Sequence, residues 1–169
     1  METEKMTTSE VDTIKIEVND DGEYIMISAD DATMFDRFAA GIRHIVELSD
    51  QTADKIDEIG KQYEGRTGFD ADMEQVAAIS RINVEFSREA VRTVDSIFGE
   101  DTVKKVFRST YNVIPDFLPS VNLITEFFEQ VTPYMEKMFN RKLETQEKAG
   151  KARMAKYQPQ DHKKPARRR

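Results

Sequence analysis

The sequence predicts a mainly α-helical protein with an N-terminal β-hairpin, a long antiparallel helical hairpin, shorter C-terminal helices and a disordered basic tail. Three observations lead to this fold class. An Asp-Gly pair separates two short apolar segments, two long segments repeat apolar residues at three- and four-residue steps, and glycine and proline divide the remainder. We expect a flexible N-terminus over residues 1–12, a single domain over 13–143 and a disordered basic tail over 144–169.

The first predicted element is a β-hairpin over residues 13–28. Its two apolar segments flank Asp21-Gly22. A type I′ turn at this pair needs positive φ at both positions and would place Val18 opposite Ile25. Alternation along the first strand would turn its apolar side chains inward, namely Ile14, Ile16 and Val18. Because an isolated hairpin is marginal in water, this one must pack on a helix or pair with another chain.

Two long amphipathic helices should follow and pack antiparallel. Asp30 and Asp31 are suited to cap the first helix, which begins near Ala32, and Asp70 or Asp72 can cap the second. The apolar stripe of the first comprises Phe35, Phe38, Ile42, Ile45, Ala53, Ile56, Ile59 and Tyr63. That of the second comprises Met73, Val76, Ile79, Ile82, Phe86, Ala90, Val94 and Ile97. The connection is short and contains two glycines, which predicts a helical hairpin.

A joint at Gly99 separates this helical hairpin from the rest of the chain. Glycine tolerates positive φ, so we expect Gly99 to end the second long helix. Glu100 and Asp101 would then offer carboxylates to the free N–H groups of a short helix. We expect Phe98 and Phe107 to be buried at this joint, which would set the angle of the closing helices.

The last predicted helix follows an extended link bracketed by Pro115 and Pro119, with Ser120 as its N-cap. Pro133 lies inside its apolar pattern and should kink or split it. Beyond Leu143 the pattern disappears, so we expect a frayed helix and then disorder.

Charge is divided unevenly along the chain, whose net charge is −7. Residues 145–169 carry nine Lys and Arg against two acidic side chains, a net +7, whereas residues 1–144 carry 16 basic and 30 acidic side chains, a net −14. The basic arm ends in Lys163, Lys164, Arg167, Arg168 and Arg169. It could bind nucleic-acid phosphates, dock on an acidic protein surface such as a second copy, or remain solvated without a partner.

The usual residues of catalytic and metal sites do not cluster in this sequence. It has no Cys, and His44 and His162 lie far apart. Glu17-x-Asn19-x-Asp21-Gly22 superficially resembles an EF-hand loop, but Ser28 stands where the bidentate Glu is required. We therefore predict no enzyme, no cofactor and no metal site. No apolar segment is long enough for a membrane span, and the polar start lacks a signal peptide, so we expect a cytoplasmic protein.

Apolar residues near the joint and in the last helix form the candidate partner-binding site. Core packing is the default interpretation, but two adjacent aromatics cannot both face one stripe fully, and Met-rich helices suit adaptable grooves. The candidate residues are Phe98, Phe107, Phe127, Phe128, Met135 and Met138.

The order of these parts is similar to that of a known family. A short hairpin leads into Ser28-Ala-Asp-Asp-Ala-Thr-Met-Phe-Asp-Arg-Phe38, and Val94-Asp-Ser-Ile-Phe-Gly-Glu-Asp-Thr-Val-Lys-Lys-Val-Phe107 follows two long helices. Over roughly residues 12–142 the chain resembles the tail assembly chaperones of long-tailed phages and prophages of Gram-positive bacteria. The resemblance implies a non-enzymatic protein in the host cytoplasm that binds the tape measure protein while tail tube subunits polymerise around it.

We therefore expect a tail assembly chaperone whose partners are the tape measure protein, the tail tube protein or both. A free hairpin edge could also pair with another copy and form a homo-oligomer. The alternative is a phage structural or nucleic-acid-associated protein that binds through the basic arm, since nucleic acid would be contacted only there. No membrane partner is expected.

Overall fold

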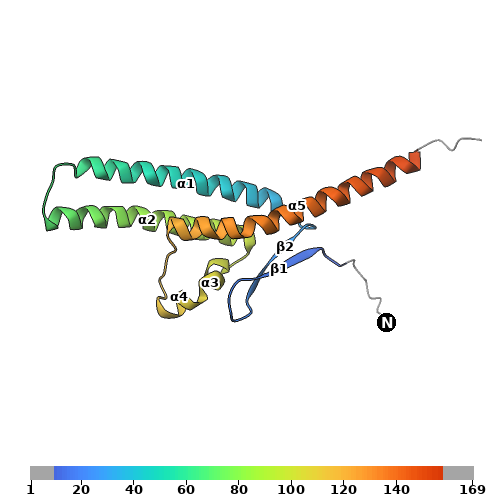
Figure 1. The fold of residues 1–169 in the computed structure, drawn as a ribbon, viewed down its shortest axis with the longest axis horizontal. Helices are drawn as coiled ribbons and strands as arrows, with labels where there is room; N and C mark the ends of the chain where they lie inside the picture. The colour runs from blue at the N-terminus through green and yellow to red at the C-terminus, as the bar shows by residue number, and fades with distance from the viewer. Residues whose placement is uncertain (1–9, 158–169) are drawn as a thin grey trace, which may run out of the picture.

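A computed structural model of the protein describes residues 10–157; the expectations for residues 1–9 and 158–169 lie outside the described residues. The described chain is mainly helical and begins with a two-stranded antiparallel hairpin, as predicted (Figure 1). Its elements are β1 (Thr13–Glu17), β2 (Tyr24–Ser28), α1 (Met34–Gln62), α2 (Phe69–Phe98), α3 (Thr102–Val106), α4 (Arg108–Val113) and α5 (Val121–Tyr157).

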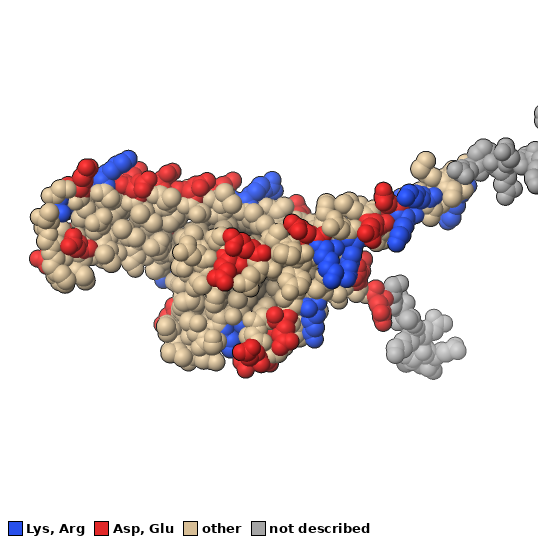
Figure 2. Space-filling view, viewed as in Figure 1, with Lys and Arg blue, Asp and Glu red and all other residues tan. Residues whose placement is uncertain are grey.

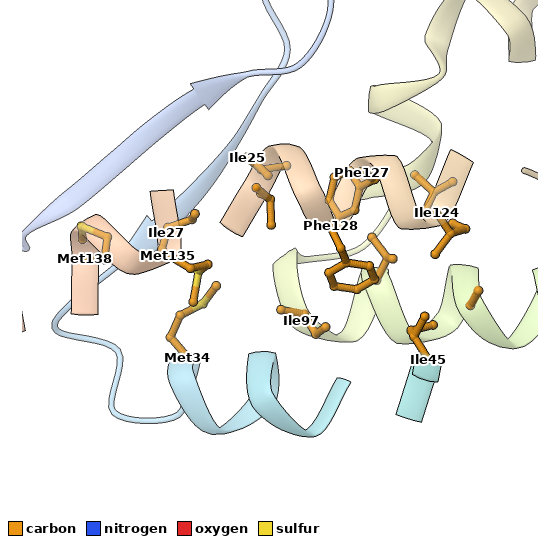
Figure 3. Close-up of a cluster of buried hydrophobic side chains, with 14 of the residues drawn as sticks. Ile25, Ile27, Met34, Ile45, Ile97, Ile124, Phe127, Phe128, Met135 and Met138 are labelled. Carbon is orange, nitrogen blue, oxygen red and sulfur yellow. The ribbon is translucent and has the colours of Figure 1, made fainter. Parts of the chain in front are cut away.

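The core has three layers with α5 in the middle. α1 and α2 form the predicted antiparallel helical hairpin, and the first half of α5 packs against both of them. β2 packs on α5 as well, so Ile25 and Ile27 face the same helix that contacts Met34 and Ile97 from the other side (Figure 3). A hairpin that is marginal alone is thereby stabilised by burying its apolar face.

The β-hairpin has the predicted faces but a different turn. Ile16 lies opposite Ile25, so the register is displaced by two residues from the expected one. Gly22 has φ 77°, but Asp21 does not adopt positive φ, so no type I′ turn forms. Instead the Asn19 carboxamide oxygen accepts hydrogen bonds from the N–H groups of Asp21 (3.0 Å) and Glu23 (3.2 Å) and closes a longer turn.

Both long helices begin beside the acidic residues expected at their N-termini, but these residues do not act as caps. α1 starts at Met34, two residues later than predicted, because Asp31 accepts hydrogen bonds from both the N–H (2.9 Å) and the hydroxyl (2.8 Å) of Thr33 in a preceding turn. α2 starts at Phe69 after Gly68, which places Asp70 and Asp72 in its first turn. There their negative charges interact favourably with the positive end of the helix dipole.

α5 is longer and more continuous than predicted. It is one helix of 37 residues that includes Pro133, so of the two predicted effects of this proline, a kink or a split, the split does not occur. Pro133 is exposed and lies on the side of α5 away from the buried Met135 and Met138. Residues 144–157, expected to be frayed or disordered, continue α5 as a helix to Tyr157, and Figure 1 shows this end projecting away from the body.

Candidate partner-binding surfaces

A closed cluster of four phenylalanines joins α1, α2 and α5 at the predicted joint. Ring centroids of Phe38 and Phe98 lie 6.2 Å apart, those of Phe98 and Phe127 lie 5.5 Å apart, and Phe128 contacts both Phe127 (5.5 Å) and Phe38 (6.2 Å). Edge-to-face pairs of this kind add stability beyond the apolar area that they bury. Phe98 lies between the helical hairpin and α5 as predicted, but it is half-buried rather than fully buried.

The structure places the candidate partner-binding residues mostly inside the protein. Phe127 and Phe128 are both buried, although they are adjacent, because α5 lies between two layers and can bury two faces at once. Met135 and Met138 are also core residues. Phe107 is half-buried and packs on Phe117, with ring centroids 5.8 Å apart. In this conformation the four α5 side chains are available to a partner only if α5 separates from the body.

The Gly99 joint is held by Asp95 rather than by the acidic residues that follow the glycine. Gly99 has the predicted positive φ, 114°. Asp101 lies at the N-cap of α3 but makes no side-chain cap hydrogen bond, which differs from the expectation. Asp95 of α2 instead accepts a hydrogen bond from the N–H of Val103, at 3.1 Å. Burial raises the pKa of Asp95, and the nearby Asp101 charge adds to this.

The hairpin turn is bound to the same region through a polar cluster. The Arg108 guanidinium donates two hydrogen bonds to the Glu23 carboxylate, and its Nε–Oε2 distance is 2.7 Å. Asn19 donates to Glu23 (2.7 Å) and to the Lys105 carbonyl oxygen (2.8 Å). The hydrogen bonds from Arg108 hold the pKa of Glu23 below its usual range. The turn, α3 and α4 therefore form one connected unit.

An open apolar groove lies along α2, where the helical hairpin has no third helix. We call it the α2 groove; it has a volume of about 530 Å³, and its apolar lining comprises Val76, Ile79, Val84, Leu118 and Val121. It exists because α5 begins beside the middle of α2, where the Ser87 hydroxyl donates a 2.7 Å hydrogen bond to the Pro119 carbonyl oxygen. Figure 1 shows that α5 covers only one half of the helical hairpin.

Three large apolar side chains extend this surface toward the tip of the helical hairpin. Phe69, Met73 and Val76 are 77%, 54% and 62% exposed. The expectation that Met73 and Val76 belong to the packed stripe of α2 is wrong, because α1 alone cannot cover so wide an apolar face. Phe69 was not singled out from the sequence, although its spacing to Met73 and Val76 places the three on one face of a helix.

The projecting end of α5 carries a second exposed apolar surface. Its first residues also contact the body, since Phe139 packs on Phe35, with ring centroids 5.7 Å apart, and Arg141 pairs with Asp12 at 3.1 Å. We define the α5 tip as residues 139–157. Its large apolar side chains are exposed, namely Phe139, Leu143, Met154 and Tyr157. Six Lys and Arg in this range stand against two Glu. The basic-arm residues predicted from the sequence, Lys163, Lys164, Arg167, Arg168 and Arg169, lie outside the described residues.

Charge is distributed differently over the two ends of the molecule. Figure 2 shows acidic side chains along most of the outer edge of α1 and mixed basic and acidic ones along the α5 tip. His44 is half-exposed, and its Nε2 lies 3.2 Å from a Glu89 carboxylate oxygen. Within residues 10–157 no three His, Cys, Asp or Glu side chains are placed to hold a metal ion.

None of the helices between residues 10 and 157 is both long and apolar enough to cross a membrane. In comparisons with known proteins, no family model, no curated protein and no solved structure matches this chain. The two candidate binding surfaces of the described residues are the α2 groove and the α5 tip.

Proposed function

We propose that this protein is a non-enzymatic tail assembly chaperone that binds helical segments of a phage tape measure protein. The α2 groove carries the proposal. Two packed helices with an uncovered apolar face accept a third amphipathic helix, as in helix-in-groove recognition. A tape measure protein, which is long and helical, offers many such segments, and the order of elements from the hairpin to the joint is that of the resembling family.

The half-buried interior of the helical hairpin supports the same role. Ile56, Ile59, Ile79 and Ile82 are only half-buried in the part of the hairpin that α5 does not cover. A bound helix would complete their burial, and each Å² of apolar surface removed from water contributes roughly 25 cal/mol. The acidic side chains along α1 would meanwhile remain in water and disfavour aggregation of the uncovered state.

The proposal expects a very long, coiled-coil-rich reading frame, the tape measure protein, beside this gene, and the test is co-expression with that protein. We expect a soluble complex that co-purifies, whereas the long protein alone should precipitate. The double substitution Phe69→Asp and Met73→Asp should abolish co-purification, because it places charges on the apolar surface that continues the α2 groove toward the tip of the helical hairpin. Val113→Asp is the matched control, because Val113 is 80% exposed and lies outside the groove.

Unchanged solubility of the long protein, or equal co-purification by the groove variant and the control, would refute this function. The tail tube protein provides a second bait in the same experiment. Capture of the tube protein alone would replace the tape measure protein as the partner.

A second candidate function is supported by the α5 tip. Its Lys148, Lys151, Arg153 and Lys156 side chains are exposed on a helix that extends beyond the body, where phosphates of a nucleic acid could reach them. On this alternative the protein is a phage structural or nucleic-acid-associated protein. Its affinity for DNA or RNA should fall steeply with salt and disappear when the chain ends at Leu143. No measurable affinity at low salt would exclude it.

A further inference from the structure

We propose that the α5 tip of one copy packs into the α2 groove of the next, so that the protein assembles head to tail with itself. The occupant of the groove is thus a second copy of this chain. The inference concerns the isolated protein, and a tape measure helix as in the proposed function would compete with the second copy for the same groove.

The two surfaces are complementary in shape: the groove can accept a helix, and the tip is a projecting helix. The α2 groove is an uncovered apolar surface, and the α5 tip beyond its contacts with Phe35 and Asp12 projects away from the body (Figure 1). Phe139 and Leu143 are about half-exposed, and Met154 and Tyr157 are 73% and 87% exposed. Spacings of 4, 11 and 3 residues place these four side chains on one face of α5.

The two regions also carry opposite net charge. Residues 47–85, which form the uncovered part of the helical hairpin, carry ten acidic and four basic side chains, a net −6. Residues 139–157 carry six basic and two acidic side chains, a net +4. The groove lining itself is uncharged, so the attraction acts between the acidic helical hairpin around the groove and the basic tip; it favours their encounter, whereas two basic tips would repel each other. A symmetric pairing of tip with tip is therefore disfavoured.

The geometry of a single copy excludes an internal contact. Figure 1 shows the tip of the helical hairpin and the end of α5 at opposite ends of the molecule. Within the body, α5 runs in the same direction as α2, since Ser87 contacts Pro119 and Phe98 contacts Phe127 farther along both. A tip that enters the neighbouring groove in this direction extends the line of that copy's own α5. The interface joins two different surfaces, so repetition produces an open chain of copies.

The test is sedimentation velocity of the full-length protein from micromolar to near-millimolar concentration. We expect growth that continues past the dimer and weakens with added salt. Val76→Asp damages the groove and Met154→Asp damages the tip, and each should lower the association constant about tenfold or more because it buries a charge at the interface. Val113→Asp should associate like the unmodified protein. Both altered positions are well exposed, and equal melting temperatures will show that the variants are folded.

Mixing the two damaged variants gives the decisive result. The groove variant retains an intact tip and the tip variant an intact groove, so an equimolar mixture should form one-to-one heterodimers that grow no further. A monomeric unmodified protein at all concentrations, a mixture that stays monomeric, or association unaffected by either substitution would overturn the inference. A monomer that still binds the tape measure protein would leave the proposed function standing.

Discussion

Gly41→Ala tests a close approach between α1 and α2. A Cβ atom at Gly41 would lie 2.2 Å from Cδ1 and 3.0 Å from Cγ1 of Ile97, and 3.4 Å from a methyl group of Thr93. Carbon atoms prefer about 3.5–4.0 Å. Ile97 is only 2% exposed, so its side chain has little space into which it can move. We expect an overpacking cost of about 1–3 kcal/mol.

Gly60→Ala is the matched control, because Gly60 lies in the same helix and nothing would lie within 4 Å of its Cβ. Alanine favours a helix over glycine by about 1 kcal/mol, a gain that both variants share. Their difference therefore isolates the overpacking cost. At about 2–4 °C per kcal/mol for a chain of this size, Gly41→Ala should melt about 2–12 °C below Gly60→Ala.

A double-mutant cycle makes this prediction sharper. Ile97→Val removes the Cδ1 atom and should cost about 0.5–1.5 kcal/mol alone. In that background Gly41→Ala should be clearly less destabilising, a coupling that urea unfolding of the four proteins measures. If Gly41→Ala and Gly60→Ala stabilise the protein equally, or if the cycle is additive, the helices do not approach as described and the reasoning is refuted.

Three further substitutions test the joint, the polar cluster and α5. Asp95→Asn keeps an oxygen acceptor but removes a carboxyl group whose pKa is raised by burial. Wild-type stability falls as pH rises from the unfolded-state pKa to the raised folded-state pKa of this group. The variant should therefore be more stable than wild type at pH 7 and lose this advantage in acid, as urea unfolding at the two pH values will show. Glu23→Gln should destabilise the protein at neutral pH, because the hydrogen bonds from Arg108 that lower the pKa of Glu23 stabilise its charged form in the folded state. The difference in melting temperature from wild type should vanish as pH falls through that lowered pKa, and a difference that stays constant with pH would contradict this. Pro133→Ala restores a helix N–H at an exposed position and should raise stability by at most about 3 kcal/mol, and an unchanged melting temperature would mean that α5 already accommodates the ring.

The local rules predicted the β-hairpin faces but not the β-hairpin register. Side chains alternate with a period of two, so a displacement by two residues leaves Ile14 and Ile16 on the buried face. The turn itself depends on Asn19, whose side chain also reaches the Lys105 carbonyl oxygen 86 positions away. A short motif could not reveal that contact.

The burial of α5 depends on layers rather than on periodicity. Phe127 and Phe128 are adjacent and cannot lie on one narrow stripe, which suggested that one of them was free to bind a partner. A helix between two layers buries a wider face, and only the tertiary arrangement shows that α5 is such a helix. The exposure of Met73 has the same origin, because it depends on where α5 begins. The positive φ of Gly99 and the position of Phe98 at the joint, in contrast, could be predicted from the residues around Gly99 alone.

The central position of α5 has a consequence for folding during synthesis. Ile25 and Ile27 are made early but are covered by a helix that the ribosome adds last, and Arg141 binds Asp12 across 129 positions. Until residues 121–138 have emerged, the β-hairpin lacks the helix that covers most of its apolar face, and its main remaining contacts with the helical hairpin are those with α2. Completion of the protein is therefore a late docking event that joins the two ends of the chain, and messages truncated before Met138 should yield products that proteases remove.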